Sequence, residues 1–494
     1  ASKAGAANFM NGFNVLNGVP ASMNSHLLTD ILRGEWGWKG LVVSDWNSFG
    51  ETLIHGTAED EKDASAKCLS AGSDVDMVSG VFQKGLRRAL EEGRITQAQI
   101  DDAVRRMLRL KYALGLFEDP FRYLSERRRR DELEQPQYRA TAREAATASM
   151  VLLKNNNDIL PLKSGGSIKK VALIGPYLDR KATKDYLSSW TGGIGDALSY
   201  DASKVVTPAQ ALKPALEAMG FEVSLTPVCP DVECGSEDDI VKTMQATREA
   251  DVAIIFVGER GDDCGESRSL THLGLPRNQE HLIKVAANTK KPVIMVLFNS
   301  RPLIFPVAKE KAEAILMAWQ PGCETGNALA DIITGKVSPS GKLPVTLPLN
   351  MGQIPIYYNG YSTGRPRTAP GEMHTSGYMD ASNEPAWPFG FGLSYTTFSY
   401  SPIRLNKPVI AKGETLEATV LVTNKGGMTG SEVVQCYVRD LAADVTRPLR
   451  ELKGFEKIKL APGEYHNVTF KITAEDLSYW NQNLQFKSDP GKFQ

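Results

Sequence analysis

A carboxylate at the end of an apolar run is the first feature of the sequence that could do chemistry. Asp45 follows Lys39-Gly40-Leu41-Val42-Val43-Ser44 and precedes Trp46. Such a run, broken by polar residues and Gly50, is typical of a short buried strand that ends in a loop. Parallel α/β enzymes place reactive groups at the carboxyl ends of strands. For an isolated Asp, capping of the next helix is the better explanation, so a catalytic role requires a partner group.

A polar loop farther along the chain holds carboxylates that could work with Asp45. It follows the apolar run 252–257 and contains Glu259, Asp262, Asp263 and Glu266. Any one of them alone is better explained as part of a solvated acidic loop. With Asp45 they supply the parts for two-carboxylate catalysis, in which one carboxylate stays ionised as nucleophile and another is held protonated as acid. Glycoside hydrolysis needs such a pair, and the separation of the carboxyl groups decides between retention and inversion.

Other catalytic groups receive less support from the sequence. Trp46 offers a flat apolar face to a sugar ring, with core packing as its alternative role. The six histidines show no HExxH pattern, and neither a GxSxG elbow nor a Walker loop is present. Gly192-Gly193-Ile194-Gly195 superficially resembles a dinucleotide loop but lacks the GxGxxG spacing and a preceding strand. We therefore expect no cofactor and no metal.

Composition and charge exclude further classes of function. The 494 residues include 57 basic and 58 acidic side chains, for a formal net charge of −1. No strongly basic face is predicted, so we expect no nucleic-acid partner. No apolar run approaches the length of a membrane span, and the first residues lack the basic-then-apolar pattern of a signal peptide.

Cys229 and Cys234 are close enough in the sequence to pair across a tight loop, and whether they do so stays open. A zinc site there is less favoured, because no second pair of Cys or His stands at ligand spacing.

The elements around Asp45 alternate between strand and helix patterns. Strands are predicted within 1–20, at 41–43 and at 73–77, and helices over 27–33, 58–71, 82–92 and 97–114. This order implies right-handed parallel crossovers in three βα units.

The remainder of the chain predicts two further domains, in line with about three domains for this length. Strands at 171–174, 252–257, 293–298 and 314–319 alternate with helices near 208–219, 237–249, 277–288 and 325–334. Such alternation indicates a parallel sheet covered on both faces. After a loop-rich stretch over 340–395, apolar and polar residues alternate between turn signals, which predicts a small β-sandwich.

Several segments resemble glycoside hydrolase family 3, in particular its three-domain bacterial β-glucosidases, over nearly the whole chain. The nucleophile segment of that family is similar to residues 16–21, 27–37 and 39–46. Its second-domain signatures are similar to Val151-Leu152-Leu153-Lys154-Asn155, Ser340-Gly341-Lys342-Leu343-Pro344 and Pro388-Phe389-Gly390-Phe391-Gly392-Leu393-Ser394-Tyr395.

The resemblance implies an α/β fold class with three parts. These are the C-terminal part of a (β/α)8 TIM-like barrel over 1–118, an α/β sandwich with a mostly parallel sheet over 151–398, and a fibronectin type III-like β-sandwich over 399–494. A linker and helix occupy 119–150. In that family about five further barrel strands would precede Ala1. We expect this chain to lack them, and turnover to require the missing segment, because three βα units cannot close a barrel.

The resemblance also implies roles for single residues. Asp45 looks like the nucleophile of a retaining mechanism, and Glu266, in Gly265-Glu266-Ser267, looks like the acid/base supplied by a second-domain loop. Leu270 and His272 depart from the Arg and the Asp or Asn that follow it in the family. Glu259 is therefore a fallback for the acid/base.

Glu51 is a remoter fallback for the acid/base.

Three residues are predicted substrate contacts. Met10 and Phe13 resemble residues that line the sugar subsite beside the nucleophile, and Trp46 is the third.

These observations predict a retaining glycoside hydrolase that releases terminal non-reducing β-D-glucose from β-glucosides and short oligosaccharides by double displacement. The alternatives are a β-xylosidase and a catalytically silent carbohydrate-binding fragment. The resemblance implies a periplasmic or secreted bacterial protein. A homodimer is the candidate assembly, with the oligomeric state left open.

Overall fold

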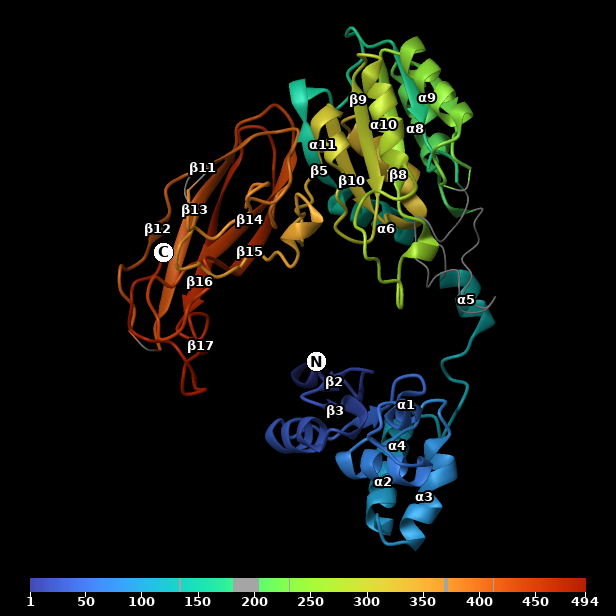
Figure 1. Cartoon of the computed structure of the whole chain (residues 1–494), viewed down its shortest axis with the longest axis vertical. Helices are drawn as coiled ribbons and strands as arrows, with labels where there is room; N and C mark the ends of the chain where they lie inside the picture. The colour runs from blue at the N-terminus through green and yellow to red at the C-terminus, as the bar shows by residue number, and fades with distance from the viewer. Residues whose placement is uncertain (133–134, 181–203, 231, 368–371, 412) are drawn as a thin grey trace. The chain divides into compact units, whose positions relative to one another are not determined.

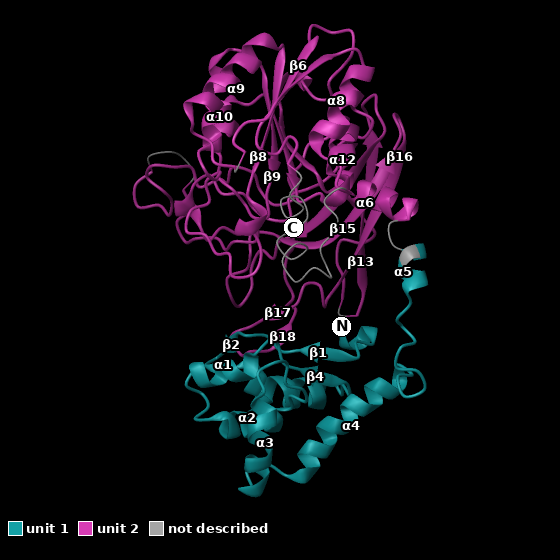
Figure 2. Cartoon of the chain, turned by 90° about the vertical axis from the view of Figure 1, so that its right-hand side faces the viewer, with its two compact units in different colours: residues 1–133 teal, residues 134–494 magenta. Residues whose placement is uncertain are grey.

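The computed structural model describes residues 1–132, 135–180, 204–230, 232–367, 372–411 and 413–494. The glycine-rich segment 192–195 lies outside these described residues. The chain divides into two compact units, residues 1–133 and 134–494 (Figure 2). Each unit has hydrophobic clusters of its own.

Parallel backbone segments form the centre of the first unit. Strand β1 (Asn8–Met10) pairs in parallel with β4 (Leu41–Val43), with Asn8 opposite Leu41. Val43 in turn forms a single parallel bridge with Val75. The parallel crossovers predicted for this region are therefore present.

The strand predicted at 73–77 is wrong in its extent, because only the bridge at Val75 forms. Val78 has a left-handed backbone with φ of +70°. The Asp76 carboxylate accepts the Phe82 amide at 3.1 Å, at the start of α3 (Val81–Glu91). The chain thus turns toward the helix directly after the bridge, which leaves no room for a longer strand.

Helices account for most of the first unit. The segment predicted as a helix over 27–33 runs from His26 to Glu35 with π-helical hydrogen bonding, including a bond from the Trp36 amide to the Ile31 carbonyl at 2.9 Å. The helix predicted over 58–71 begins later, because Asp60 caps it by accepting the Asp63 amide. The elements of this unit besides β1 and β4 are η1 (Ser2–Ala4), β2 (Val15–Leu16), β3 (Val19–Pro20), η2 (Ala21–Met23), η3 (His26–Glu35), α1 (Ser48–Ile54), α2 (Glu61–Ala71), α3 (Val81–Glu91), α4 (Gln97–Ala113) and α5 (Glu126–Glu132).

A mostly parallel sheet forms the core of the second unit (Figure 1). Its strand order is β5-β10-β9-β8-β6-β7. Only the edge strand β5 runs antiparallel, against β10. The strands are β5 (Val151–Asn155), β6 (Lys170–Ile174), β7 (Glu222–Thr226), β8 (Val252–Gly258), β9 (Val293–Phe298) and β10 (Ala314–Trp319).

Helices cover both faces of this sheet, as the continuous apolar strands predict. One face packs against α6 (Pro136–Ser149), α8 (Pro208–Ala218) and α12 (Thr325–Ile333). The other packs against α10 (Gln279–Asn288), α11 (Pro306–Lys311) and, at its margin, α9 (Glu237–Glu249). Short 3-10 turns complete the domain: η4 (Asn156–Asp158), η7 (Gly261–Asp263), η8 (Gly322–Glu324) and η9 (Met351–Gln353).

The C-terminal part is the predicted β-sandwich. One sheet contains β11 (Phe398–Tyr400), β12 (Arg404–Leu405), β13 (Thr415–Asn424) and β16 (Tyr465–Thr473), and the other contains β14 (Gly430–Val438) and β15 (Glu451–Leu460). A hairpin of β17 (Tyr479–Trp480) and β18 (Phe486–Lys487) follows. The core comprises Val420, Val422, Val434, Ile458, Leu460 and Val468.

Candidate active site

Asp45 lies in the short connection between β4 and helix α1. Its Oδ1 accepts the Trp46 amide at 2.7 Å, and its side chain is half-buried. Asn47, with φ of +59°, occupies the N-cap position of α1. Asp45 therefore does not cap that helix, which was the alternative explanation for its position.

The loop around Asp45 is held from both sides by the segment that follows α2. The Ser44 amide donates to the Val75 carbonyl at 2.9 Å, and the Asn47 amide donates to the Met77 carbonyl at 2.9 Å. Because the two bonds flank Asp45, the backbone that carries its carboxylate has little freedom to move.

The buried carboxylate of Asp74 anchors the start of β4. Its Oδ2 accepts the Val42 amide at 2.8 Å and Arg33 Nη2 at 2.7 Å, and its Oδ1 accepts Arg106 Nη1 at 2.6 Å. Arg33 also donates to the Gly40 carbonyl at 3.0 Å. A single acidic side chain thus joins β4, which leads to Asp45, with the η3 segment and helix α4.

The predicted substrate contacts lie at the same end of the parallel strands. Met10 ends β1 opposite Val43, two residues before Asp45. Met10 is 55% exposed and Trp46 is 64% exposed, whereas Phe13 is half-buried. Trp46 therefore does not serve core packing in this unit, which was the alternative to a sugar-stacking role.

Asp45 does not line either of two cavities found in this unit. One, of about 460 Å³, is bordered by residues of the β3 turn and α2. The other, of about 520 Å³, lies between residues 74–78 and helices α3 and α4. The Asp45 carboxylate is presented at the strand ends instead.

Glu266, the predicted acid/base, is exposed in the loop that follows β8. Gly265 and Ser267 on either side of it have left-handed backbones, with φ of +112° and +58°. The backbone therefore turns at Glu266, whose carboxyl group is carried by a loop rather than by a helix or strand.

Glu259, the fallback acid/base, is buried in an ion pair. Its Oε1 lies 2.9 Å from Arg301 Nε, and its Oε2 accepts the Ser300 amide at 2.7 Å and the Ser300 hydroxyl at 3.1 Å. Burial raises the pKa of the Glu259 carboxyl, against the lowering effects of Ser300 and Arg301. A carboxylate with both oxygens engaged inside the domain is suited to a structural role.

Glu51, the remoter fallback for the acid/base, lies in the first turn of α1.

The topology of the sheet places the loop after β8 at a switch point. From β6 the chain passes to β7 on one side and then to β8 on the other, so that neighbouring strands continue in opposite directions. Ligands of open α/β sheets bind outside the carboxyl ends of the strands at such a point. Tyr177, which follows β6, donates its hydroxyl hydrogen to the Glu259 carbonyl and links the two loops.

Arg301 was not among the residues predicted from the sequence. A signal was available, since Asn299-Ser300-Arg301 directly follows the buried run 293–298, as Gly258-Glu259 follows 252–257. The carboxyl ends of adjacent parallel strands lie at one edge of a sheet, but the adjacency of β8 and β9 is known only from the strand order.

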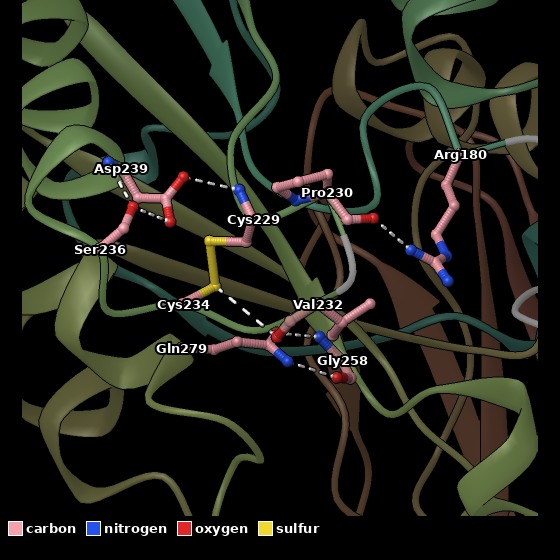
Figure 3. The surroundings of a disulfide bond; sticks show 9 residues. All are labelled: Arg180, Cys229, Pro230, Val232, Cys234, Ser236, Asp239, Gly258 and Gln279. Atoms are coloured by element: carbon pink, nitrogen blue, oxygen red, sulfur yellow. Dashed lines mark hydrogen bonds between the residues drawn. A yellow bond between two sulfur atoms is a disulfide. The ribbon is translucent and has the colours of Figure 1, made fainter.

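Cys229 and Cys234 form a disulfide, which answers the question left open by the sequence (Figure 3). The Cys229 amide donates to Asp239 Oδ1 at 2.9 Å, and the Cys234 amide donates to the Arg277 carbonyl at 3.0 Å. The guanidinium of Arg277 pairs with Glu233 and lies 3.4 Å from Asp263. The disulfide loop is thereby connected to the segment that carries Glu266.

No cluster of three or more metal-ligating side chains occurs in the part of the chain that the structure describes. Within that same part, no helix has the length and apolarity needed to cross a membrane.

Three family models match the chain. The model of the glycosyl hydrolase family 3 N-terminal domain matches residues 1–110, that of the glycosyl hydrolase family 3 C-terminal domain matches 150–395, and that of a fibronectin type III-like domain matches 432–494.

Curated proteins and solved structures are similar over nearly the whole chain. A periplasmic beta-glucosidase of Salmonella typhimurium is 39% identical, covering 99% of this chain and 66% of that protein. A beta-xylosidase of Formosa agariphila is 36% identical, covering 99% and 67%. The crystal structure of a beta-glucosidase from Listeria innocua in complex with isofagomine is 37% identical with a TM-score of 0.92, covering 99% and 66%. The chain thus spans about two thirds of the length of these relatives.

Proposed function

Because the chain belongs to glycosyl hydrolase family 3, we propose that it acts as a retaining β-glucosidase, releasing terminal β-D-glucose from β-glucosides and short oligosaccharides. The position of Asp45 carries the proposal. Its carboxylate stands at the carboxyl end of β4, is not used to cap α1, and lies within the segment matched by the N-terminal family model. Names of relatives support the substrate class, since one is a periplasmic beta-glucosidase and one structure contains laminaribiose.

The proposed reaction has two displacements. Asp45 attacks the anomeric carbon, the bond to the leaving-group oxygen breaks, and Glu266 gives that oxygen its proton. The carboxylate of Glu266 then takes a proton from water, the water oxygen attacks the anomeric carbon of the glycosyl-enzyme, and Asp45 leaves. Trp46, Met10 and Phe13 are proposed to contact the sugar, with the Trp46 indole as a stacking surface.

The surroundings of the two carboxyl groups support Glu266 rather than Glu259 as the proposed acid/base. Glu266 is exposed on a loop, whereas Glu259 is buried with both oxygens engaged by Ser300 and Arg301. An acid must reach the substrate oxygen, and a carboxylate enclosed by its own domain is not accessible for that transfer.

A β-xylosidase is the second candidate function, favoured by the 36% identity to the Formosa agariphila enzyme.

We further propose a periplasmic location, by similarity to the Salmonella typhimurium relative. Assembly as a homodimer is a separate proposal that sedimentation of the purified protein tests.

A mechanism-based label tests the proposed function. The protein is incubated with a 2-fluoro β-glucoside or a 2-fluoro β-xyloside that carries a good leaving group, digested and weighed. We expect a mass increase on the peptide that contains Asp45, and none in D45N. Preferential labelling by the xyloside would favour the second candidate. A label on another peptide, or no label in a sample that hydrolyses aryl glycosides, would refute the role of Asp45. Absence of both labelling and hydrolysis would refute catalysis by this chain.

A further inference from the structure

We propose that Arg301 is a positioning residue for Glu266, because its guanidinium holds the loop on both sides of that carboxyl group. The inference rests on the proposed function, in which Glu266 is the acid/base. Arg301 does not itself touch the substrate in this proposal.

The first half of the argument is the anchor of Arg301. It lies just after β9, and its Nε is 2.9 Å from Glu259 Oε1, just after the neighbouring strand β8. The Glu259 side chain is only 1% exposed and that of Arg301 only 17%. The amide and the hydroxyl of Ser300 both donate hydrogen bonds to the other carboxylate oxygen, Glu259 Oε2. The position of the guanidinium is therefore fixed by the two central strands of the sheet.

The second half of the argument concerns the two remaining nitrogens of Arg301, which bind backbone carbonyls of the loop. Nη2 donates to the Asp263 carbonyl at 2.6 Å, and Nη1 donates to the Arg268 carbonyl at 3.1 Å. Asp263 precedes Glu266 in the sequence and Arg268 follows it. One planar group thus joins the two arms of the loop, and only the rigid fork of an arginine provides three nitrogens for a carboxylate and two carbonyls at once.

Regular secondary structure gives the loop no support near Glu266. A second bond between its arms runs from Arg268 Nε to the Asp262 carbonyl at 2.9 Å, but both ends of that bond belong to the loop itself, whereas Arg301 ties the loop to the end of β9. Residues 264–273 form neither helix nor strand, and Gly265 and Ser267 both have left-handed backbones. General acid catalysis requires the carboxyl oxygen within hydrogen-bond reach of the leaving-group oxygen. A displacement of about 1 Å can reduce the rate by about 100-fold.

The competing explanation is that Arg301 only neutralises the buried charge of Glu259. A loss of domain stability would then reduce activity on every substrate by the same factor. A positioning role instead makes the loss depend on the leaving group, because only poor leaving groups need protonation.

The experiment compares kcat/KM for the 2,4-dinitrophenyl and the 4-methylphenyl β-glycoside in R301K, E266A and E266A/R301K. The ratio kcat/KM reports formation of the glycosyl-enzyme, the step in which the acid acts. R301K keeps a positive charge for Glu259 but has one nitrogen in place of three. We expect R301K to lose about 10- to 100-fold on the 4-methylphenyl substrate and less than about 3-fold on the dinitrophenyl substrate. R301K should add no further loss to E266A. The control is R248K, at an exposed position of α9.

The outcomes separate the inference from the proposed function. If E266A shows no dependence on the leaving group, the role of Glu266 fails, and the Arg301 inference fails with it. If E266A shows this dependence and R301K loses equally on both substrates, or nothing, only the Arg301 inference is overturned. If R301K does not fold, the double variant E259Q/R301Q removes both charges together, and its kcat/KM values on the same two substrates are compared instead.

Hydrogen exchange provides a second measurement. In R301K we expect faster exchange at the Asp263 and Cys264 amides and unchanged exchange in β8 and β9.

Discussion

The Ser44 hydroxyl oxygen accepts the Met77 amide hydrogen at 2.7 Å and donates its own hydrogen to the Asp45 carbonyl at 2.9 Å. Ser44 is fully buried. One hydroxyl group therefore connects the candidate nucleophile to the neighbouring parallel segment, in addition to the backbone bonds that flank Asp45.

Replacing Ser44 by alanine should disturb both stability and catalysis. S44A leaves the Met77 amide without its partner, and an unpaired buried donor costs about 1–3 kcal/mol. We expect kcat/KM to fall about 10-fold for good and poor leaving groups alike, because the nucleophile acts on both. Urea unfolding and the two aryl glycosides measure these effects, with S70A as an exposed serine control. A loss confined to poor leaving groups would contradict a link to the nucleophile.

Replacing Asp74 by alanine should destabilise the protein by about 3–5 kcal/mol, because Arg33 and Arg106 then lose a carboxylate that is only 1% exposed. The matched control is D102A, whose surface pair with Arg105 is 58% exposed on the acidic side and should be worth at most about 1 kcal/mol. The free energy of unfolding in urea is the measurement. Equal effects of the two variants would show that the buried network does not anchor β4.

Asp63 should make stability depend on pH in the acidic range. Burial acts to raise the pKa of its carboxyl, but hydrogen bonds from Lys67, the Glu59 amide and Arg94 outweigh it, and the pKa is lowered below its ordinary value of 3.8. A lowered folded-state pKa contributes stability that is fully present above the unfolded-state pKa and is lost as the pH falls through the folded-state value.

D63N should therefore cost about 1.5 kcal/mol at pH 7 and progressively less below pH 3.8. Urea titrations at both ends of this range provide the test, with the exposed residue Asp30 changed to Asn as control. A cost that stays the same from pH 7 to below 3.8 would exclude the charged contacts as its source.

Gly40 should tolerate no side chain. A Cβ at this position would lie 2.2 Å from the Trp38 ring and 2.4 Å from the Ala7 carbonyl oxygen, at the entry to β4. We expect G40A to lower the free energy of unfolding by about 1–3 kcal/mol. G463A is a useful comparison, because no atom lies within 4 Å of its Cβ and only the left-handed φ of +79° opposes it. If G40A were no worse than G463A, close packing at Gly40 would not matter.

The sequence predicted the central strands of the second unit within about one residue, because fully buried parallel strands have continuous apolar runs such as Val252–Gly258. Strand β7 (Glu222–Thr226) was not predicted. It lies at the sheet edge and contains exposed residues, so that its pattern does not differ from that of a loop. Its place in the sheet comes from backbone pairing with β6, which no local pattern encodes.

A site residue could be predicted from the sequence only where a reactive side chain directly follows a recognisable strand pattern. Asp45 was predicted as a carboxylate at a strand end, and the structure places it there. The partnership of Glu259 with Arg301 was not predicted, because it depends on the order of β8 and β9 in the sheet. The choice between Glu259 and Glu266 likewise depends on burial, which only tertiary structure determines.

Strand β5 has a consequence for the order of events during synthesis. It is the first strand of its sheet to leave the ribosome, yet Val151 pairs with Met317 and the Leu153 carbonyl accepts Trp387 Nε1, 234 residues away. Until those partners are made, a nascent chain carries an apolar edge segment with unpaired backbone groups, which is prone to wrong pairing. We therefore expect release from the ribosome before β10 to yield aggregation-prone intermediates, with completion of the domain delayed until the Trp387 loop has emerged.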